Sequence, residues 1–563
     1  MNAGENSGTQ LVTRRALLRL AAAAAGVWLL QACGPAAQPS PTAAPQPSPA
    51  QPAAPATRLP AAGTPAPAAT AGATQAPAAA TKVAAPKKGG ALRIGNVTDV
   101  TGFSPAFLAP GITPCVFQVF DTLIHLDDDF KVQPRMAESW TFSPDYLTMT
   151  IKLRQGVRFH SGKELTADDV VGTIAFYADK VNTANLLQFA SSIKDPKALD
   201  RYTVELHFEQ VPANVYDSLS WLFIIDPTDT NGLKNRPNGT GPFKLQRWQP
   251  NEKSVYSRFE QYRQPGLPCL DGYELSVWPD AQSLIVTLET GTVDCVVGPI
   301  APLEAKRLAS SGKYQFSKDK GALVFGLYMN VTVKPLSDKR VRQAISWTID
   351  RQRFCNTYLQ GLSAPRSLPW PSFSPAYDAN LDAYYSKRDL AKARELLKEA
   401  GYENGFDVDL LCTRQRPGSA ELAEQVQSDL KEIGIRVRLD VQELGVYNTR
   451  GAAGNLQMQT GTFQRSNKTP VSLFLMTFPW RTENNISHFT SDKYSGLVKK
   501  LSGILDVEQT KPYLREMNQL LLDECFALSI APMPTSYAMV QSVKGYRDTL
   551  ESYPILESAW LDR

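Results

Sequence analysis

The first ninety residues place the strongest limit on what this 563-residue chain can fold into, because most of them cannot enter a core. Residues 34–86 consist mainly of Ala, Pro, Thr and Gln, with very few charged or large apolar side chains. A segment of that composition buries too little apolar surface to fold, and its prolines favour extended conformations of roughly 3 Å per residue. We predict a disordered tether over residues 34–89, so the folded part lies downstream of it.

An export signal is predicted ahead of the tether. Basic residues within 13–19 precede an apolar run at 20–30, which is too short to span a bilayer but suits the core of a signal peptide. The run ends in Leu30-Gln31-Ala32-Cys33, which resembles a bacterial lipobox. The resemblance implies a signal peptide over residues 1–33 and a lipid on the thiol of Cys33. The basic residues also resemble a twin-arginine signal, with a general secretory signal as the alternative.

Composition and motifs exclude several classes of function. The net charge of +4 is small, and no basic tail or interleaving of aromatic and basic residues occurs, so we predict no nucleic-acid partner. The four histidines and seven cysteines show no metal-ligand spacing. No Walker loop, dinucleotide fingerprint or nucleophile elbow occurs either. We therefore predict no metal, no cofactor and no enzymatic activity.

The remaining cysteines have two interpretations. In an exported protein some of them could form disulfides, but sequence alone does not give the pairing. Alternatively they are small buried hydrophobes. They are Cys115, Cys269, Cys295, Cys355, Cys412 and Cys525.

Apolar periodicity begins where the tether ends. A short strand is predicted at residues 91–95, and residues 147–153 alternate between apolar and polar side chains as in a half-buried strand. Thr166 and Asp169 have the spacing of a capping box at the start of a helix. The first half of the folded part therefore contains both strands and helices.

The second half shows the same alternation more clearly. Asp338 and Asp389 are placed to cap helices. Strands are expected at 406–412 and 435–441, on either side of a helical stripe within 422–430. Short helix–strand units of this kind are typical of α/β domains.

Five stretches, in order along the chain, resemble one known family. The most specific of them is Leu153-Arg154-Gln155-Gly156-Val157-Arg158-Phe159-His160-Ser161-Gly162, which continues to Val170. The others are 119–123 with 134–140, 239–243 with 288–294, 330–351, and the helix at 390–401 with the strand that follows it. Together they resemble the extracellular solute-binding proteins of the dipeptide, oligopeptide and nickel ABC importers.

The resemblance implies an α/β periplasmic-binding-protein fold with two lobes and a hinge, and an extra subdomain on the first lobe. The implied divisions are lobe I at 90–120, 235–328 and 515–563, the subdomain at 121–234, and lobe II at 329–514.

The resemblance also implies a function. The protein would capture a small solute between its lobes and deliver it to an ABC permease, with the ATPase on a separate chain. We expect a peptide, or an anionic or hydroxylated solute, as the ligand. With the lipid anchor, we expect a monomer at the outer face of the cytoplasmic membrane, in the periplasmic space. A ligand-sensing receptor on the same fold and an extracellular hydrolase are the alternatives.

One departure from the family bears on the ligand. Peptide-binding relatives hold the ammonium of the peptide with an aspartate in a Gly-Trp-x-x-Asp type of segment. The corresponding residues 461–470 contain no acidic side chain, and Arg465, Asn467 or Lys468 falls at that place. The sequence therefore favours an anionic or hydroxyl-rich ligand over a peptide held by its N-terminus. For Arg465 the alternative is a side chain that points into solvent.

The pocket-forming segments of the family supply further candidate ligand contacts. The segment 481–485 follows the departed one and contains Arg481. For every candidate, a role in packing or in a solvated loop is the alternative. The predicted ligand contacts are Phe103, Arg366, Trp370, Arg465, Asn467 and Asn485.

Overall fold

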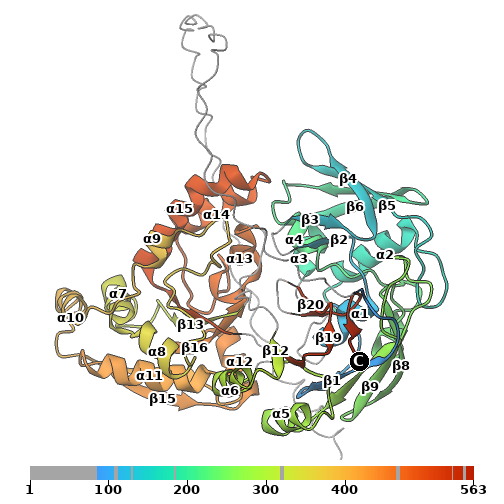
Figure 1. The fold of residues 1–563 in the computed structure, drawn as a ribbon. Helices are drawn as coiled ribbons and strands as arrows, with labels where there is room; N and C mark the ends of the chain where they lie inside the picture. The colour runs from blue at the N-terminus through green and yellow to red at the C-terminus, as the bar shows by residue number, and fades with distance from the viewer. Residues whose placement is uncertain are drawn as a thin grey trace, which may run out of the picture. The chain divides into compact units, whose positions relative to one another are not determined.

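The computed structural model describes most of the chain beyond the tether (Figure 1). The described residues are 85–106, 112–127, 131–182, 186–298, 300–316, 323–464, 469–534, 537–549 and 553–563. They belong to one compact unit, Lys82–Arg563. The predicted signal peptide, Cys33 and the tether up to residue 84 lie outside them. None of the helices they form is long and apolar enough to cross a membrane.

A seven-stranded sheet forms the first body, which we call lobe I. Its central strand is β1, which confirms the strand predicted at 91–95. It pairs in parallel with β10 and β11. Leu92 and Ile94 face one core, which also holds α1 (Thr113–Val119), whereas Gly95 faces Leu284 on α5. The strand order is β12 (Tyr314–Phe316), β18 (Ala538–Val540), β11 (Cys295–Val296), β1 (Ala91–Asn96), β10 (Gly272–Val277), β9 (Lys253–Arg258) and β8 (Phe243–Gln249).

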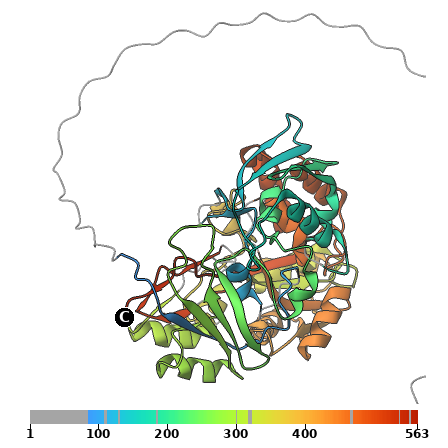
Figure 2. The same ribbon diagram turned by 90° about the vertical axis from the view of Figure 1, so that its right-hand side faces the viewer.

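Two helices and short strands complete lobe I. The helices α5 (Ala281–Glu289) and α6 (Pro302–Ser310) pack on the sheet through a small apolar cluster, and they lie next to it in both views (Figure 1 and Figure 2). The C-terminal residues form two short ladders, β19 (Val543–Lys544) with β22 (Trp560–Leu561) and β20 (Arg547–Asp548) with β21 (Pro554–Ile555).

A four-stranded antiparallel sheet forms the second body, which we call the subdomain. Met149, Ile151 and Leu153 alternate into its core, as predicted. Asp169 accepts a hydrogen bond from the backbone amide of Thr166, which confirms the capping box. The elements are β2 (Ile124–Leu126), β3 (Val132–Pro134), β4 (Ala137–Phe142), β5 (Thr148–Leu153), α2 (Ala167–Ala178), α3 (Leu187–Ser192), β6 (Ile193–Asp200), β7 (Thr203–Phe208), α4 (Val215–Leu219) and η1 (Thr230–Lys234), with sheet order β4-β5-β7-β6.

A five-stranded sheet forms the third body, which we call lobe II. Asp338 and Asp389 cap α7 and α10 through their carboxylates, as predicted. The strands are β13 (Leu323–Met329), β14 (Asp407–Cys412), β15 (Arg436–Val441), β16 (Met458–Gln464) and β17 (Ala527–Pro532), in the order β15-β14-β16-β13-β17. The helices are α7 (Lys339–Thr348), α8 (Arg351–Thr357), α9 (Ala379–Asp382), α10 (Leu390–Glu399), α11 (Ser419–Lys431), α12 (Leu444–Ala453), α13 (Val471–Met476), η2 (Phe478–Trp480), α14 (Asp492–Ser502) and α15 (Val507–Glu524).

The chain passes twice between lobe I and lobe II. The first passage leads from β12 to β13 and the second from β17 to β18. On the lobe I side β12 pairs with β18, and on the lobe II side β13 pairs with β17, so the two passages are antiparallel neighbours at both ends. The expected boundary at residues 328 and 329 falls within β13, and the one at residues 514 and 515 falls within α15. We propose that lobe II begins at β13 and extends to β17.

Lobe I and the subdomain meet through the family stretches. The backbone amide of His160 donates to Gly239 at 2.8 Å, and His160 Nε2 lies 3.0 Å from the carbonyl oxygen of Gly241. A Cβ at Gly239 would approach the carbonyl oxygen of Val119 to 2.0 Å, so only glycine fits there. The most specific stretch therefore holds the two bodies together.

A buried charge network strengthens the same junction. Arg135 is 4% exposed and lies 2.9 Å from Asp121 and 2.9 Å from Glu557. Arg263 adds a second cation at 3.3 Å from Asp121, and Tyr262 donates to Glu557 at 3.0 Å. Burial alone would lower the pKa of Arg135, but the two carboxylates raise it above its ordinary value.

The six cysteines after Cys33 all fall within the described residues. Each is free and buried. Burial raises the pKa of the thiols of Cys525 and Cys412 to about 11, so both thiols are neutral. The cysteines therefore act as small core residues, and the disulfide interpretation is not supported.

Candidate ligand-binding cavity

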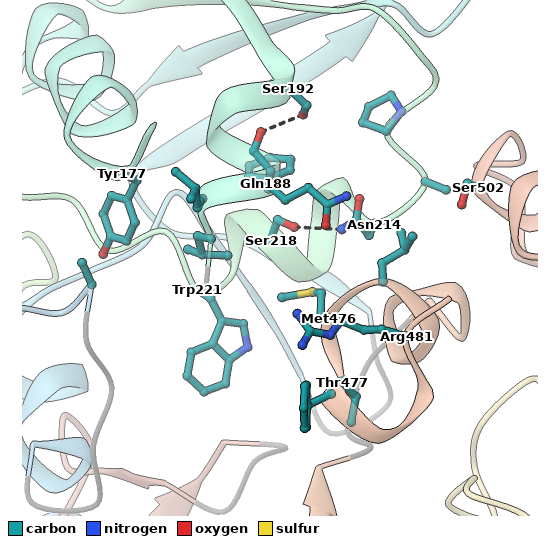
Figure 3. A pocket seen from close by; sticks show the side chains of 18 of the residues that line it. Tyr177, Gln188, Ser192, Asn214, Ser218, Trp221, Met476, Thr477, Arg481 and Ser502 are labelled. Carbon is teal, nitrogen blue, oxygen red and sulfur yellow. Dashed lines mark hydrogen bonds between the residues drawn. The ribbon is translucent and has the colours of Figure 1, made fainter. Parts of the chain in front are cut away.

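A cavity of about 930 Å³ lies between the subdomain and lobe II. Its size falls in the range that accommodates small-molecule ligands. The subdomain wall comes from α3, α4 and residues 209–214, and the lobe II wall from β16, α13 and η2 (Figure 3). Tyr553 joins the lining from the C-terminal segment.

Aromatic side chains form one part of the wall. Trp221 packs edge-on against Tyr553, with ring centroids 5.6 Å apart, and against Phe117 at 5.8 Å. Phe117 lies in the core of lobe I, so the contact with this buried ring restricts the position of the Trp221 indole. Leu186 and Phe478 add apolar surface on the two sides of the cavity. The arrangement supplies apolar contact area with few rotatable bonds.

Amide and hydroxyl groups lie on the subdomain side. Gln188 and Asn214 extend from the wall opposite Arg481 and Met476 (Figure 3). Asn214 Nδ2 donates to Ser218 Oγ at 3.3 Å, which leaves the amide oxygen available. These neutral groups can both donate and accept hydrogen bonds, as a polar ligand requires.

Arg481 is the cation among the described residues that line the cavity. Its guanidinium carbon lies 4.7 Å from the centroid of the Phe478 ring. Burial lowers its pKa, with no carboxylate to offset the effect. Its Nε is buried and has no hydrogen-bond partner within the described part of the chain. A partly desolvated cation without a partner is costly, so this site favours an incoming acceptor.

A buried carboxylate connects the two walls next to the cavity. Asp217, on α4, accepts a hydrogen bond from the backbone amide of Thr469 at 3.0 Å and from Ser472 Oγ at 2.8 Å. Asp217 is 3% exposed. The contact joins the subdomain to the start of α13 in lobe II, so the structure represents an arrangement in which the walls touch.

Four predicted ligand contacts are described, and none of them lines this cavity. Phe103 packs edge-on against Trp248 at 5.3 Å in the core of lobe I. Arg366 pairs with Asp382 at 2.7 Å, and Trp370 Nε1 donates to Asn518 at 2.6 Å. Their role as ligand contacts remains a prediction.

Asn485 has an indirect relation to the cavity. Its Nδ2 donates to the backbone carbonyl of Arg481 at 3.0 Å and to that of Phe489 at 2.8 Å. The side chain therefore stabilises the turn that carries Arg481. Arg465 and Asn467 lie outside the described residues.

Sequence reasoning missed the subdomain wall. No motif marks Gln188, Asn214 or Trp221, because each is an isolated polar or aromatic residue in a loop or short helix. The cavity brings them next to residues more than 240 positions further along the chain. A partial signal existed for Arg481, which lies in the segment 481–485 that the family resemblance had indicated.

Among the described residues, no group of three or more His, Cys, Asp or Glu side chains is placed to hold a metal ion. His160, which belongs to the family stretch, has its Nε2 within hydrogen-bonding distance of a carbonyl oxygen and packs against Phe259.

Comparison with known proteins identifies the family. Residues 131–485 match the bacterial extracellular solute-binding proteins, family 5. Haem-binding protein A of Haemophilus influenzae is 25% identical over 482 residues, which are 79% of this chain and 87% of that protein. The glutathione-binding protein GsiB of Salmonella typhi is 30% identical over 332 residues, which are 58% of this chain and 64% of that protein.

Solved structures share the fold. The periplasmic binding protein DppA from Helicobacter pylori, in complex with the peptide STSA, has a TM-score of 0.73 at 24% identity and covers 85% of this chain and 99% of its own. The binding protein AgaA from A. tumefaciens R10, in complex with agropinic acid, has a TM-score of 0.73 at 24% identity and covers 84% and 99%. The predicted two-lobed α/β binding-protein fold is confirmed. This chain therefore belongs to the bacterial extracellular solute-binding proteins of family 5, the group that serves peptide and nickel ABC importers.

Proposed function

We propose that the protein captures a small solute in the cavity between the subdomain and lobe II and presents it to the permease of an ABC importer. The observation that carries this function is the cavity itself. It is bounded by the subdomain and lobe II, whose apolar cores surround different sheets. The chain connects lobe I to lobe II through two neighbouring passages. The family match favours solute capture over sensing or hydrolysis.

The proposed mechanism is closure of the two walls around the ligand. A ligand that contacts both walls binds the closed arrangement more tightly than an open one, so it shifts the population toward closure. Because the chain joins lobe I to lobe II at two neighbouring places, closure would be a rotation of lobe II relative to lobe I. The Asp217 contact with Thr469 and Ser472 would form only when the walls meet. The permease would then recognise the closed form.

The N-terminal region defines where capture takes place. After export by a twin-arginine or general secretory route, a lipid on Cys33 would anchor the protein at the outer face of the cytoplasmic membrane. The anchored protein would be a monomer. The Ala- and Pro-rich tether would then separate the folded body from the bilayer. Labelling of the chain with a radioactive fatty acid in a bacterial host tests the anchor, and Cys33→Ala should abolish the label.

The function is tested by thermal-shift measurements with ligands of the relatives. The panel contains short peptides, glutathione, haem, agropinic acid and the nickel–histidine complex. A compound that binds only the folded state stabilises it by about 2.7 kcal/mol at a hundred times its dissociation constant, so the melting temperature rises with concentration.

A cavity-filling variant makes the test specific. Asn214→Trp should remove the ligand-induced shift, because the indole would occupy the space between the walls. Ser310→Trp places the same side chain at an exposed position on α6 and should keep the shift. If the ligand-induced shift is the same in Asn214→Trp, the ligand binds elsewhere. If none of the compounds raises the melting temperature, capture of a solute from this panel is contradicted.

A further inference from the structure

We infer that the ligand of this cavity carries a carboxylate, which the guanidinium of Arg481 binds, and that its remaining part is a neutral, peptide-sized body. The inference rests on the proposed function and specifies the class of solute. It is carried by the position of Arg481, by the absence of a partner for it among the described residues, and by the neutral wall opposite.

The position of Arg481 is fixed before any ligand arrives. The residue follows directly after η2, and its guanidinium lies over the Phe478 ring at 4.7 Å. The Asn485 side chain holds the Arg481 carbonyl at 3.0 Å. Stacking on an aromatic ring and a fixed backbone reduce the conformational freedom that binding would otherwise remove. The side chain is therefore prepared to present its planar donor edge to the cavity.

The guanidinium lacks a partner that other arginines of lobe II have. Arg351 is buried and donates to five oxygen atoms, from Arg366, Ser529, Ser346 twice and Tyr385, at 2.9 to 3.2 Å. Arg366 forms an ion pair with Asp382. For Arg481 no side-chain hydrogen bond or ion pair is present within the described part of the chain, and its Nε is buried. Unlike the arginines that stabilise the core, Arg481 retains its full donor capacity.

The charges of the described residues around the cavity leave this cation uncompensated. Glu209 is the acidic residue among the described lining residues. Its side chain is 73% exposed and lies 3.8 Å from Lys194, and no ion pair joins it to Arg481. A ligand carboxylate would therefore be the counter-ion. Paired N–H groups of arginine match a carboxylate in a bidentate manner, and such charge-assisted bonds are stronger than neutral ones.

The side chains of the subdomain wall, opposite Arg481, indicate the chemistry of the rest of the ligand. Gln188 and Asn214 provide neutral amides, and Trp221 and Leu186 provide apolar surface. None of these groups carries a negative charge that would pair with an ammonium, and a cation close to Arg481 would be repelled. The observations favour an acylated peptide or another carboxylic acid with amide groups and an apolar portion. A peptide held by a free N-terminus fits the described lining less well.

The test compares two libraries that differ in a single group. One contains N-acetylated dipeptides with free carboxylates, and the other contains the same dipeptides as C-terminal amides. Thermal shift on the full-length protein identifies binding compounds, and titration calorimetry gives their dissociation constants. We expect the carboxylates to stabilise the protein and the matching amides to bind at least about 30-fold more weakly, which corresponds to the loss of one buried charge-assisted pair.

Variants assign the difference to Arg481. Arg481→Ala should bind the carboxylates about 30-fold more weakly and no longer distinguish them from the amides. Arg416→Ala is the matched control, because Arg416 also lies over an aromatic ring in lobe II, 5.6 Å from Tyr447, but does not line the cavity. It should bind both libraries as the unmodified protein does. An unchanged melting temperature of the unliganded variants verifies that they fold.

Three results would overturn the inference. The first is amides that bind as tightly as the matching carboxylates. The second is an Arg481→Ala variant that still prefers the carboxylates. The third is failure of the whole carboxylate library while a neutral compound of the relatives' panel binds. In each of these cases the proposed function would still stand if some compound binds the protein and Asn214→Trp abolishes its binding. Failure of every compound in both libraries and in the panel would count against the carboxylate class and the proposed function together.

Discussion

The two junctions of the subdomain differ in how their charges are satisfied. At the junction with lobe I, Arg135 is buried between two carboxylates, and Gly239 leaves no room for a side chain. At the junction with lobe II, Arg481 has no carboxylate partner among the described residues, and a cavity of about 930 Å³ separates much of the walls. The first junction is completed by the chain itself, whereas the second has donor capacity that no described residue uses.

This difference indicates which parts move together. A buried network with short ion pairs resists separation, because a single partner would be left buried and uncompensated. The subdomain and lobe I are therefore expected to behave as one body. The wall of lobe II meets the subdomain beside the cavity through the Asp217 contact, so closure and opening would take place there.

Loss of the central cation should have the largest effect on the first junction. Arg135→Ala removes the buried cation between Asp121 and Glu557, which leaves Asp121 to Arg263 at 3.3 Å and Glu557 to the more exposed Arg547 at 3.0 Å, and it should destabilise the protein by about 3–5 kcal/mol. Chemical denaturation of the unliganded protein measures this effect. Arg236→Ala removes an arginine that is 78% exposed and 3.5 Å from Asp229, and it should change the stability by about 1 kcal/mol or less. Equal effects of the two substitutions would contradict the contrast between the junctions.

The first junction should also respond to acid. Burial lowers the pKa of His160 to about 4, whereas the unfolded chain has an ordinary histidine pKa of about 6.5. Between these values the unfolded state binds a proton that the folded state does not, so stability falls as the pH decreases from about 6.5 to 4. The slope contributed by this group is at most about 1.4 kcal/mol per pH unit.

Substitution of the histidine isolates that slope. His160→Gln keeps a side-chain amide that can donate to the carbonyl of Gly241 and should remove its share of the pH dependence. Burial also lowers the pKa of His125 to about 4, so a residual slope is expected from that residue. An unchanged slope between pH 6.5 and 5 in His160→Gln, measured by denaturation at several pH values, would show that His160 does not titrate as described.

The second junction should respond through ligand affinity. Asp217→Asn replaces a carboxylate that accepts two hydrogen bonds from the lobe II wall with a neutral amide. Because charge-assisted bonds are stronger than neutral ones, the closed arrangement should lose about 1–2 kcal/mol, and the ligand should bind roughly 5- to 30-fold more weakly. Asp168→Asn, an exposed position on α2, is the matched control in calorimetry. Equal affinities of the two variants would exclude a role of Asp217 in closure.

The smallest effect is expected for Arg481 in the absence of ligand. Arg481→Ala removes a side chain with no described ion pair or hydrogen bond, so the free energy of unfolding should change by about 0.5 kcal/mol or less. The substitution also removes the stacking of the guanidinium on the Phe478 ring. A loss of several kcal/mol in the unliganded protein would show that Arg481 is a structural residue, like Arg351.

Local signals in the sequence predicted much of the fold. The carboxylates of Asp338 and Asp389 cap their helices, and the Thr166–Asp169 box begins α2, because capping depends on residues within one turn. The alternation predicted over 147–153 gave the correct buried face at Met149, Ile151 and Leu153, whereas Leu147 lies before the strand and is half-buried. The resemblance to the family supplied the two-lobed arrangement, which local patterns do not contain.

The candidate site was less predictable. Whether an arginine is satisfied depends on groups far away in the chain, and nothing near Arg481 or Arg351 in the sequence distinguishes the free guanidinium from the one with five acceptors. The cavity unites residues 186–221 with residues 462–502, and such a juxtaposition follows from packing of the two bodies. Trp370, a plausible aromatic wall from sequence, is held in the core of lobe II by Asn518.

Hydrogen exchange with and without the most stabilising compound tests the central claim most directly. If a ligand bridges the subdomain and lobe II, the backbone amides of α3, α4 and α13 should become protected together, while the junction at His160 and Gly239 should not change. Protection confined to one wall, or centred on the region of Arg366 and Trp370, would contradict a ligand in this cavity.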